Sequence, residues 1–192
     1  DQPRSRGLGD VYKRQLLRLQ SRRSSEEAVK VALAEAERRV QAIATVHAAL
    51  SQNVDESVDF DEVARTIVRM AGAIASTDHA VEVITTGSFG TIQADQAQAL
   101  ATVLNELVAN SVEHGLADRD GLIEVRAERE GTSMTVTVAD DGVGFVPGTP
   151  MSGLGTQIVH QMVRGELKGS IEWAPREGGG TLVTLHANLD PA

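Results

Sequence analysis

The sequence predicts an α+β fold in which one mixed, mainly antiparallel sheet packs against a layer of helices, preceded by a helical hairpin. Three observations lead to this prediction. Residues 24–52 contain no Gly or Pro and repeat apolar side chains at helical spacing. A second stretch with few helix breakers, Ala94 to His114, predicts a long helix. Beyond it the apolar period changes to two, and the strands come in pairs around short turns.

Residues 15–52 are predicted to form the helical hairpin. Apolar positions of its second helix recur at alternating steps of four and three, in the order Val29, Leu33, Ala36, Val40, Ile43, His47 and Leu50. A stripe this narrow suits a partner helix, so we expect two chains to cover it by forming a four-helix bundle, which makes a homodimer. Residues 1–14 are expected to be an unrelated or disordered start, and the polar segment 53–60 to separate the hairpin from the rest.

Residues 61–189 are predicted to form the second domain. Helices are expected at 61–75, at 94–114 and in the later part of 142–163. Strands are expected at 80–85, 122–128, 134–139, 170–174 and 181–186. Because the turns at 130–132 and 178–180 are short and contain glycine, the last four strands should form two hairpins.

Composition narrows the classes of function. The formal net charge of the 192 residues is −9, yet residues 1–23 hold seven Lys or Arg against two Asp, which gives +5 there and −14 elsewhere. So acidic a remainder argues against a nucleic-acid-binding core. The chain has no cysteine, which excludes disulfides, thiolate metal sites and cysteine nucleophiles. No apolar run approaches the roughly 20 residues that span a bilayer, so we expect a cytoplasmic protein without membrane contact.

The predicted long helix carries two faces. Its apolar face consists of Leu100, Leu104, Leu107 and Ser111. Glu106, Asn110 and His114 follow one another at steps of four and form an adjoining polar stripe. A carboxylate and an amide oxygen one turn apart suit a hydrated Mg²⁺ ion and its phosphates, because this ion takes oxygen ligands. The alternative is a helix that only exposes polar residues, and this segment alone does not separate the two interpretations.

Asp140 ends a predicted strand and is followed by glycines at alternate positions, Gly142 and Gly144. A buried carboxylate there can accept the exocyclic amine of adenine, and glycines let the backbone approach a planar base. An ordinary Asp-Asp-Gly turn is the alternative. Two further segments are rich in glycine. Gly153-Leu154-Gly155-Thr156 opens a helix whose free N–H groups suit phosphate oxygens, and Gly178 to Gly180 lead into a strand, where a plain turn is the alternative.

Together these segments resemble the successive boxes of the Bergerat-type (GHKL) ATPase fold. The boxes are Asn-Glu-Leu-Val-Ala-Asn, Asp-Asp-Gly-Val-Gly-Phe, Gly-Leu-Gly and Gly-Gly-Thr, in this order, within the stretch from about Ala80 to Leu189. Histidine kinases, gyrase-type ATPases, Hsp90-like chaperones and anti-sigma-factor kinases share this fold. The resemblance implies a two-layer sandwich that binds ATP with Mg²⁺.

The resemblance also implies roles for single residues. Asn110 is similar to the Mg²⁺ ligand, Glu106 to the residue that positions metal or water or acts as a base, and His114 to a nucleotide contact; Glu106 and Asn110 are the candidate catalytic residues. The adenine end would consist of Asp140, Gly142, Gly144 and Thr181. The residues expected to close over the phosphates are Gly153, Leu154, Gly155 and Thr156, and residues 146–152 would form a short lid. Glu113 stands where many relatives place a Lys near phosphate.

The hairpin resembles the dimerisation region of HWE-like histidine kinases. Two segments carry this resemblance, Leu16-Leu17-Arg18-Leu19-Gln20 and the run from Arg39 to His47. Among these kinases it is similar to cytosolic sensors paired with RNA-binding antiterminator response regulators. In such kinases a phosphoacceptor His precedes the first segment by about three turns, near Arg4 here. The chain has no His before His47, itself expected to be a packing residue, so its start is expected to be truncated or replaced.

The expected function is that of a sensor histidine kinase, whose catalytic part donates the γ-phosphoryl group of ATP to a histidine and then to a response-regulator aspartate. Two alternatives remain open. One is a non-catalytic, dimeric ATP-binding interaction module, which the absence of the phosphoacceptor favours. The other is a serine kinase of the anti-sigma type, against which the hairpin argues.

Overall fold

The computed structural model describes residues 57–75, 79–117, 119–145 and 153–191, without the side chains of 71–75 and 154. The chain divides into two compact units, Asp1–Gln41 and Ala42–Ala192, and the described residues all belong to the second. The hairpin predicted for 15–52 and the lid predicted for 146–152 lie outside the described residues.

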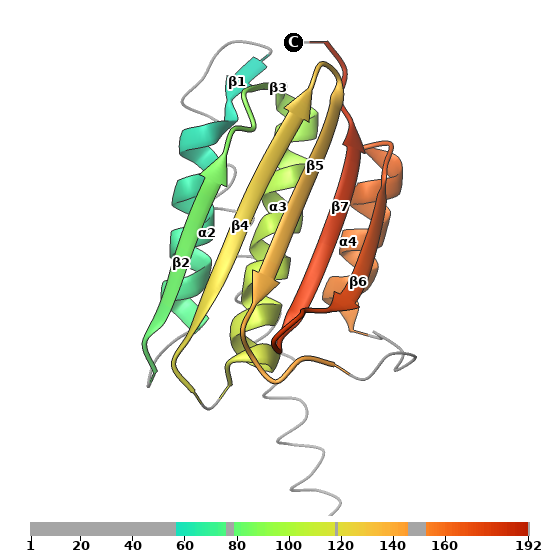
Figure 1. Ribbon diagram of the computed structural model, residues 1–192. Helices are drawn as coiled ribbons and strands as arrows, with labels where there is room; N and C mark the ends of the chain where they lie inside the picture. The colour runs from blue at the N-terminus through green and yellow to red at the C-terminus, as the bar shows by residue number, and fades with distance from the viewer. Residues whose placement is uncertain (1–56, 76–78, 118, 146–152, 192) are drawn as a thin grey trace, which may run out of the picture. The chain divides into compact units, whose positions relative to one another are not determined.

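A five-stranded sheet with the order β2-β4-β5-β7-β6 forms one layer of this unit (Figure 1). The parallel pair β2 and β4 lies at one side, and the other neighbours are antiparallel. The strands are β2 Val81–Gly87, β4 Gly121–Glu130, β5 Ser133–Asp140, β6 Ser170–Pro175 and β7 Thr181–Asn188. The predicted mixed, mainly antiparallel sheet is thereby confirmed.

Three α-helices cover one face of the sheet, and no other described element covers the opposite face, which is called the open face below (Figure 1). They are α2 Phe60–Ala75, α3 Ala94–Asn110 and α4 Leu154–Gly165. The core lies between the two layers, because alternate residues of each strand point toward the helices. In β4, for example, Ile123 and Val125 are buried, whereas Arg126 between Val125 and Ala127 is exposed. The predicted apolar face of α3 is also buried, from Leu100 to Ser111.

A second, two-stranded sheet was not predicted. It pairs β1 Ser57–Asp59 with β3 Thr91–Gln93 in antiparallel register. Each strand has only three residues, which is too short for a period-two pattern to emerge from the sequence.

The prediction of one regular helix from Ala94 to His114 needs correction. The regular part ends at Asn110, and a π-helical turn, η1 Ser111–Gly115, continues it. In this turn Leu116 N donates to Ser111 O at 2.9 Å, which is a wider loop than an α-helix makes. His114 is therefore no longer in phase with Glu106 and Asn110, because the spacing of i to i+8 presumes regular α-helix.

Candidate nucleotide-binding site

Asp140, the last residue of β5, is the most deeply buried carboxylate at this end of the sheet, with 2% of its surface exposed. Strand alternation explains the burial, because Asp140 follows Met134, Val136 and Val138 on the face that meets the helices. Its Oδ1 accepts hydrogen bonds from Gly142 N at 3.0 Å and Thr181 N at 3.1 Å. No hydrogen bond from the rest of the described chain reaches Oδ2, which keeps its capacity to accept one.

Three backbone segments approach Asp140 so closely that only glycine fits. A Cβ added to Gly142 would lie 2.2 Å from Gly115 O, and one added to Gly180 would lie 1.9 Å from Asp140 O. Gly115 O also accepts Val143 N at 3.0 Å, so the π-helical turn is bonded directly to the loop after β5. The end of η1, the loop after β5 and the turn before β7 therefore form one closely packed group around the carboxylate.

The polar residues of α3 lie along the same helix as the buried apolar face. Glu106 is buried, Asn110 is half-buried at the junction of α3 and η1, and His114 is exposed in the π-helical turn. Exposure thus increases toward the end of the helix at which η1 meets Asp140. An amide and a carboxylate one turn apart on α3 offer oxygen atoms of the kind that Mg²⁺ prefers.

The start of α4 supplies a further set of backbone donors. Gly153 is the N-cap residue, Leu154 begins the helix, and Gln157 N donates to Gly153 O at 3.2 Å. Gly155 and Thr156 are buried in the first turn. The first N–H groups of a helix have no partner within it, and together with the helix dipole they suit an anion.

The structure thus brings Asp140, Gly142, Gly144 and Thr181 into one group. Gly144 joins it because a Cβ there would lie 3.0 Å from Gly180 O. Glu106 and Asn110 share α3, and Gly153 to Thr156 share the start of α4; no hydrogen bond between described residues links either set to Asp140.

Sequence reasoning assigned no site role to two contributors to the group around Asp140. Gly115 lies in the π-helical turn, where a Cβ would lie 2.9 Å from Asp140 Oδ1, and Gly180 was named only as part of the glycine segment before the last strand. A glycine directly after a polar stripe and a glycine directly before a strand were the available signals. Both are also common at ordinary helix ends and turns, which is why they were not distinctive.

Among the described residues, no group of three His, Cys, Asp or Glu is placed to hold a metal ion. The described helices include none that is long and apolar enough to span a membrane.

Two family models match the chain. The model for histidine kinase-, DNA gyrase B- and HSP90-like ATPases matches residues 95–191, and a histidine kinase model matches residues 14–74. The chain is 41% identical over 179 residues to the sensor histidine kinase PdtaS of Mycolicibacterium smegmatis, which covers 91% of the chain and 36% of that protein. For PdtaS of Mycobacterium tuberculosis H37Rv the identity is 41% over 175 residues, covering 88% and 35%. The chain therefore spans about a third of the length of these relatives.

Solved structures share the fold. The histidine kinase domain of the Erythrobacter litoralis EL346 blue-light activated histidine kinase superposes with a TM-score of 0.69 at 23% identity, covering 80% of this chain and 74% of that one. The mycobacterial sensor histidine kinase MprB gives 0.54 at 22% identity, covering 72% and 100%. The chain belongs to the family of histidine kinase-, DNA gyrase B- and HSP90-like ATPases, and the predicted Bergerat-type fold is confirmed. Membership implies a domain that binds ATP.

Proposed function

We propose that this chain is the phosphoryl-donating part of a two-component sensor histidine kinase, which binds ATP together with Mg²⁺. The observation that carries the proposal is the carboxylate of Asp140, buried at the end of β5 with one oxygen saturated by two backbone amides and the other left to accept. The matches to both a histidine kinase model and an ATPase model in one chain support it.

The adenine end of the site is built on Asp140. Its Oδ2 accepts the exocyclic amine of the base, while the bonds to Oδ1 hold the carboxylate in place. Gly142 and Gly144 leave room beside the base because they carry no Cβ. Thr181, whose amide already bonds Asp140, supports the water network around the adenine.

The phosphate end is built on α3 and α4. The backbone N–H groups of Gly153, Leu154, Gly155 and Thr156 donate to phosphate oxygens, and His114 is a further contact to the nucleotide. Asn110 would hold Mg²⁺ through its amide oxygen, an atom of the kind that this ion prefers. Neutralisation of the phosphate charge is the chemistry that Mg²⁺ supplies when it is bound.

The reaction transfers the γ-phosphoryl group to a histidine. The bond from the γ-phosphorus to the β–γ bridging oxygen breaks, a bond from an imidazole nitrogen to phosphorus forms, and ADP leaves. Glu106 takes up the imidazole proton or orients the attacking group. An aspartate oxygen on a response regulator then attacks the phosphorus, and the histidine leaves. Because the step needs little covalent help from the protein, positioning and charge neutralisation account for most of the rate.

The partners follow from this function. We expect two chains to pair into a homodimer through segment 15–52, and we propose that segment 61–189 is the catalytic domain. The phosphoryl group passes to a response regulator, of the RNA-binding antiterminator type, without direct contact between this chain and nucleic acid. We place the protein in the cytoplasm and without membrane contact.

A second candidate function is a dimeric ATP-binding module that does not catalyse transfer. One observation favours it: the chain has no histidine before His47, so none stands near Arg4, where the resemblance expects the acceptor. We therefore expect this chain to bind ATP without phosphorylating itself. A serine kinase of the anti-sigma type is less well supported, because the histidine kinase model matches residues 14–74.

The site assignment is tested by ATP titration of Asn110→Ala and Asp140→Ala proteins. Each substitution removes a polar contact to the ligand, so we expect an affinity loss of at least about tenfold. Asn105→Ala is the matched control, because it removes the same side chain from a different side of α3 and should leave affinity unchanged. Wild-type affinity in both test proteins would refute the assignment.

Incubation with radiolabelled ATP tests the reaction. The chain alone should remain unlabelled, whereas an added histidine-containing hairpin from a related kinase should become labelled at histidine, with the acid lability of phosphohistidine. Bound ATP without label on the added hairpin would support the non-catalytic module, and label on a serine would support the anti-sigma type.

A further inference from the structure

The turn between β6 and β7 has a backbone that needs external support. It runs from Arg176 to Gly180, and Gly178, Gly179 and Gly180 have φ values of +88°, +112° and +96°. Because glycine has no Cβ, three successive glycines give the turn many accessible conformations when it is unfolded or loosened. Holding the turn in one conformation therefore has a high entropic cost. The position of this turn matters, because Thr181 follows it directly and donates to Asp140 Oδ1.

Arg176 closes the turn through its backbone. Its N donates to Gly180 O at 3.0 Å, and its O accepts Gly179 N at 3.1 Å. Gly180 in turn packs against the carbonyl oxygen of Asp140, where a Cβ would lie at 1.9 Å. A displacement of Arg176 would therefore shift Gly180 and the Thr181 amide together.

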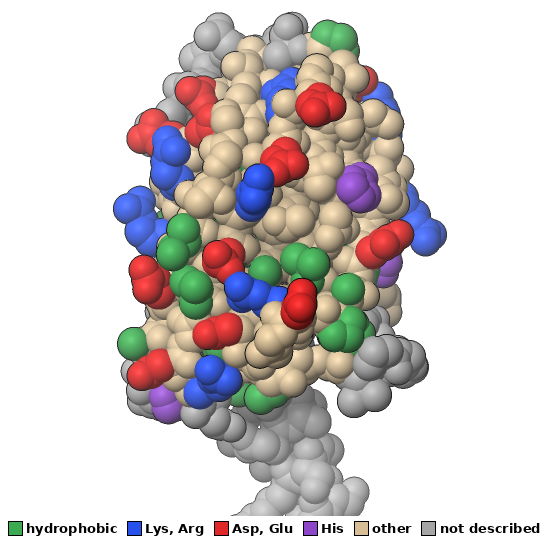
Figure 2. All heavy atoms as spheres, viewed as in Figure 1, with side chains coloured by type: hydrophobic (Ala, Val, Ile, Leu, Met, Phe, Trp, Pro, Cys, Tyr) green, Lys and Arg blue, Asp and Glu red, His purple; other side chains and the backbone are tan. Residues whose placement is uncertain are grey.

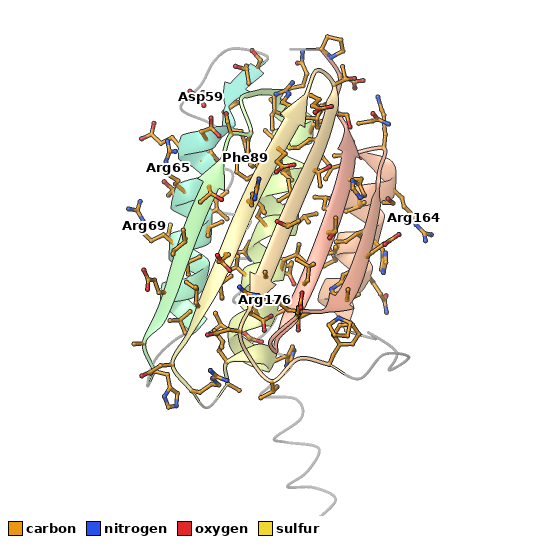
Figure 3. All side chains as sticks on the ribbon, viewed as in Figure 1. Asp59, Arg65, Arg69, Phe89, Arg164 and Arg176 are labelled. Atoms are coloured by element: carbon orange, nitrogen blue, oxygen red, sulfur yellow. The ribbon has the colours of Figure 1, made fainter. Side chains whose placement is uncertain are left out.

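The side chain of Arg176 anchors the turn to the open face of the sheet. Its Nη2 donates to Glu124 Oε2 in an ion pair, which reaches past β7 and β5 to β4 (Figure 3). Glu124 lies opposite Ala139 in the β4–β5 register, one residue before Asp140. The anchor is thus attached to the strand beside the carboxylate whose surroundings it fixes.

Burial distinguishes this ion pair from others on the same face. The Arg176 side chain is 28% exposed and Glu124 46%, whereas Arg126 and Glu128, which also pair on β4, are 64% and 60% exposed. Figure 2 shows charged side chains of both signs across this face of the sheet. Because Arg176 is the less exposed cation, water and salt screen its pair less. Its Nη1 is buried and has no partner among the described residues, so the guanidinium depends on Glu124 for compensation.

We propose that Arg176 is a positioning residue for adenine recognition, which acts by anchoring the glycine turn to Glu124 so that the Thr181 amide holds the Asp140 carboxylate in place. The inference rests on the proposed function, in which Asp140 accepts the exocyclic amine of adenine. Arg176 itself does not touch the nucleotide. Loss of the Arg176 side chain should weaken recognition of the adenine base more than binding of the phosphates, since the phosphate contacts come from α3 and α4.

Comparing the binding affinities for ATP and inosine triphosphate isolates the contribution of base recognition. Inosine has an oxo group in place of the exocyclic amine, whereas the triphosphate is the same. Since hydrogen bonds to charged groups contribute about 1.5–3 kcal/mol, the wild-type chain should prefer ATP by about ten- to a hundredfold. In Arg176→Ala we expect this preference to fall by about fivefold, mostly through weaker ATP binding.

Further variants separate positioning from general stability. Glu124→Gln should lower the preference in the same direction as Arg176→Ala but by less, because it removes the negative charge that compensates the Arg176 guanidinium and keeps an amide oxygen as acceptor at nearly constant shape. Arg176→Lys should keep the preference, since it retains a cation for Glu124. Arg126→Ala is the matched control on the same face and should behave as wild type. Circular dichroism of each protein checks that it is folded; should Arg176→Ala fail this check, Glu124→Gln carries the test alone.

The outcomes distinguish this inference from the proposed function. A wild-type chain that binds both nucleotides equally would refute adenine reading by Asp140. A wild-type preference for ATP that survives unchanged in Arg176→Ala and Glu124→Gln, even with both nucleotides bound more weakly, would overturn the positioning role of Arg176 alone.

Discussion

The two ends of the five-stranded sheet are held by different kinds of polar contact. At the nucleotide end, where β5 finishes, backbone amides bond one buried carboxylate, and glycines let backbone segments touch. At the opposite end, where β4 turns into β5 around Gly131, long side chains make the bonds. Around Asp140, a polar group thus remains available to a ligand. At the opposite end, the polar side chains of Gln96 and Arg129 are bonded to backbone carbonyls of the protein itself.

Gln96 is the centre of the opposite end. It is buried at the start of α3, and its Nε2 donates to Glu166 O at 3.1 Å and Asn188 O at 3.4 Å. Its Oε1 accepts Asp190 N at 2.8 Å. One side chain thereby joins the start of α3 to the segments that follow α4 and β7.

Arg129 and Asp61 secure the loop before β3 at the same end. Arg129 Nη1 donates to Phe89 O at 2.9 Å and Thr91 O at 2.6 Å. The Asp61 carboxylate accepts Phe89 N at 2.6 Å and the Ser88 hydroxyl at 2.8 Å. Partial burial would raise the pKa of Asp61, but these hydrogen bonds, with smaller contributions from Gly90 and Arg65, leave the pKa below its ordinary value.

The largest effect is expected at the nucleotide end, from Gly180→Ala. The added Cβ would collide with Asp140 O, and alanine would be strained at the φ of +96° that Gly180 adopts. We therefore expect the free energy of unfolding to fall by about 3 kcal/mol or more, and we expect ATP binding to be lost. Gly178→Ala is the control, because its φ is also positive but no atom lies within 4 Å of the new Cβ. Thermal unfolding and ATP titration measure both; equal effects of the two substitutions would mean that the contact with Asp140 is unimportant.

Asp140→Asn should separate binding from stability. The new side chain keeps an oxygen for the Gly142 and Thr181 amides but presents an N–H donor to the amine of adenine. ATP affinity should therefore fall by about a hundredfold, with a change of no more than about 1 kcal/mol in unfolding free energy. Isothermal calorimetry and chemical denaturation provide the two readings. Unchanged affinity would place adenine elsewhere.

Gln96→Ala should show the reverse at the opposite end. Three hydrogen bonds are lost and their backbone partners are left unpaired, so we expect the free energy of unfolding to fall by about 2 kcal/mol. The affinity of the folded protein for ATP should stay unchanged. Gln98→Ala, an exposed position on the same helix, is the control and should alter neither quantity. A loss of affinity in folded Gln96→Ala would show that the two ends are coupled.

The smallest effect is expected from Asp61→Asn, and it should depend on pH. Because the folded-state pKa of Asp61 is lowered, its charged form stabilises the fold above the ordinary value of about 4, and this contribution is lost as the pH falls through the lower folded-state value. At neutral pH we expect a loss of about 1 kcal/mol. Denaturation at pH 7 and pH 3 should show the gap between variant and wild type closing at the lower pH; a gap that widened there would contradict this sign.

The sequence indicated that residues around Asp140 act together, but it did not indicate the contacts at the opposite end. Asp140, Gly142 and Gly144 are neighbours in the chain, and their residue types report backbone geometry directly. Gln96 and Asp190 are 94 residues apart, and Arg129 and Phe89 are 40 apart, so no local pattern connects them. The π-helical turn was missed for a similar reason, because its last residue, Gly115, contacts Gly142 and Val143 in a loop distant in the sequence.

Hydrogen exchange with and without Mg²⁺ and ATP tests the central claim that the nucleotide binds at the end of the sheet around Asp140 and not at the opposite end. Under native conditions, protection on nucleotide addition should appear in peptides that cover 140–145, 153–157 and 178–182. Peptides that cover 87–93, 129–134 and 186–191 should exchange as they do without nucleotide. Protection confined to the opposite end, or absent from the segments around Asp140 while ATP is bound, would contradict the account.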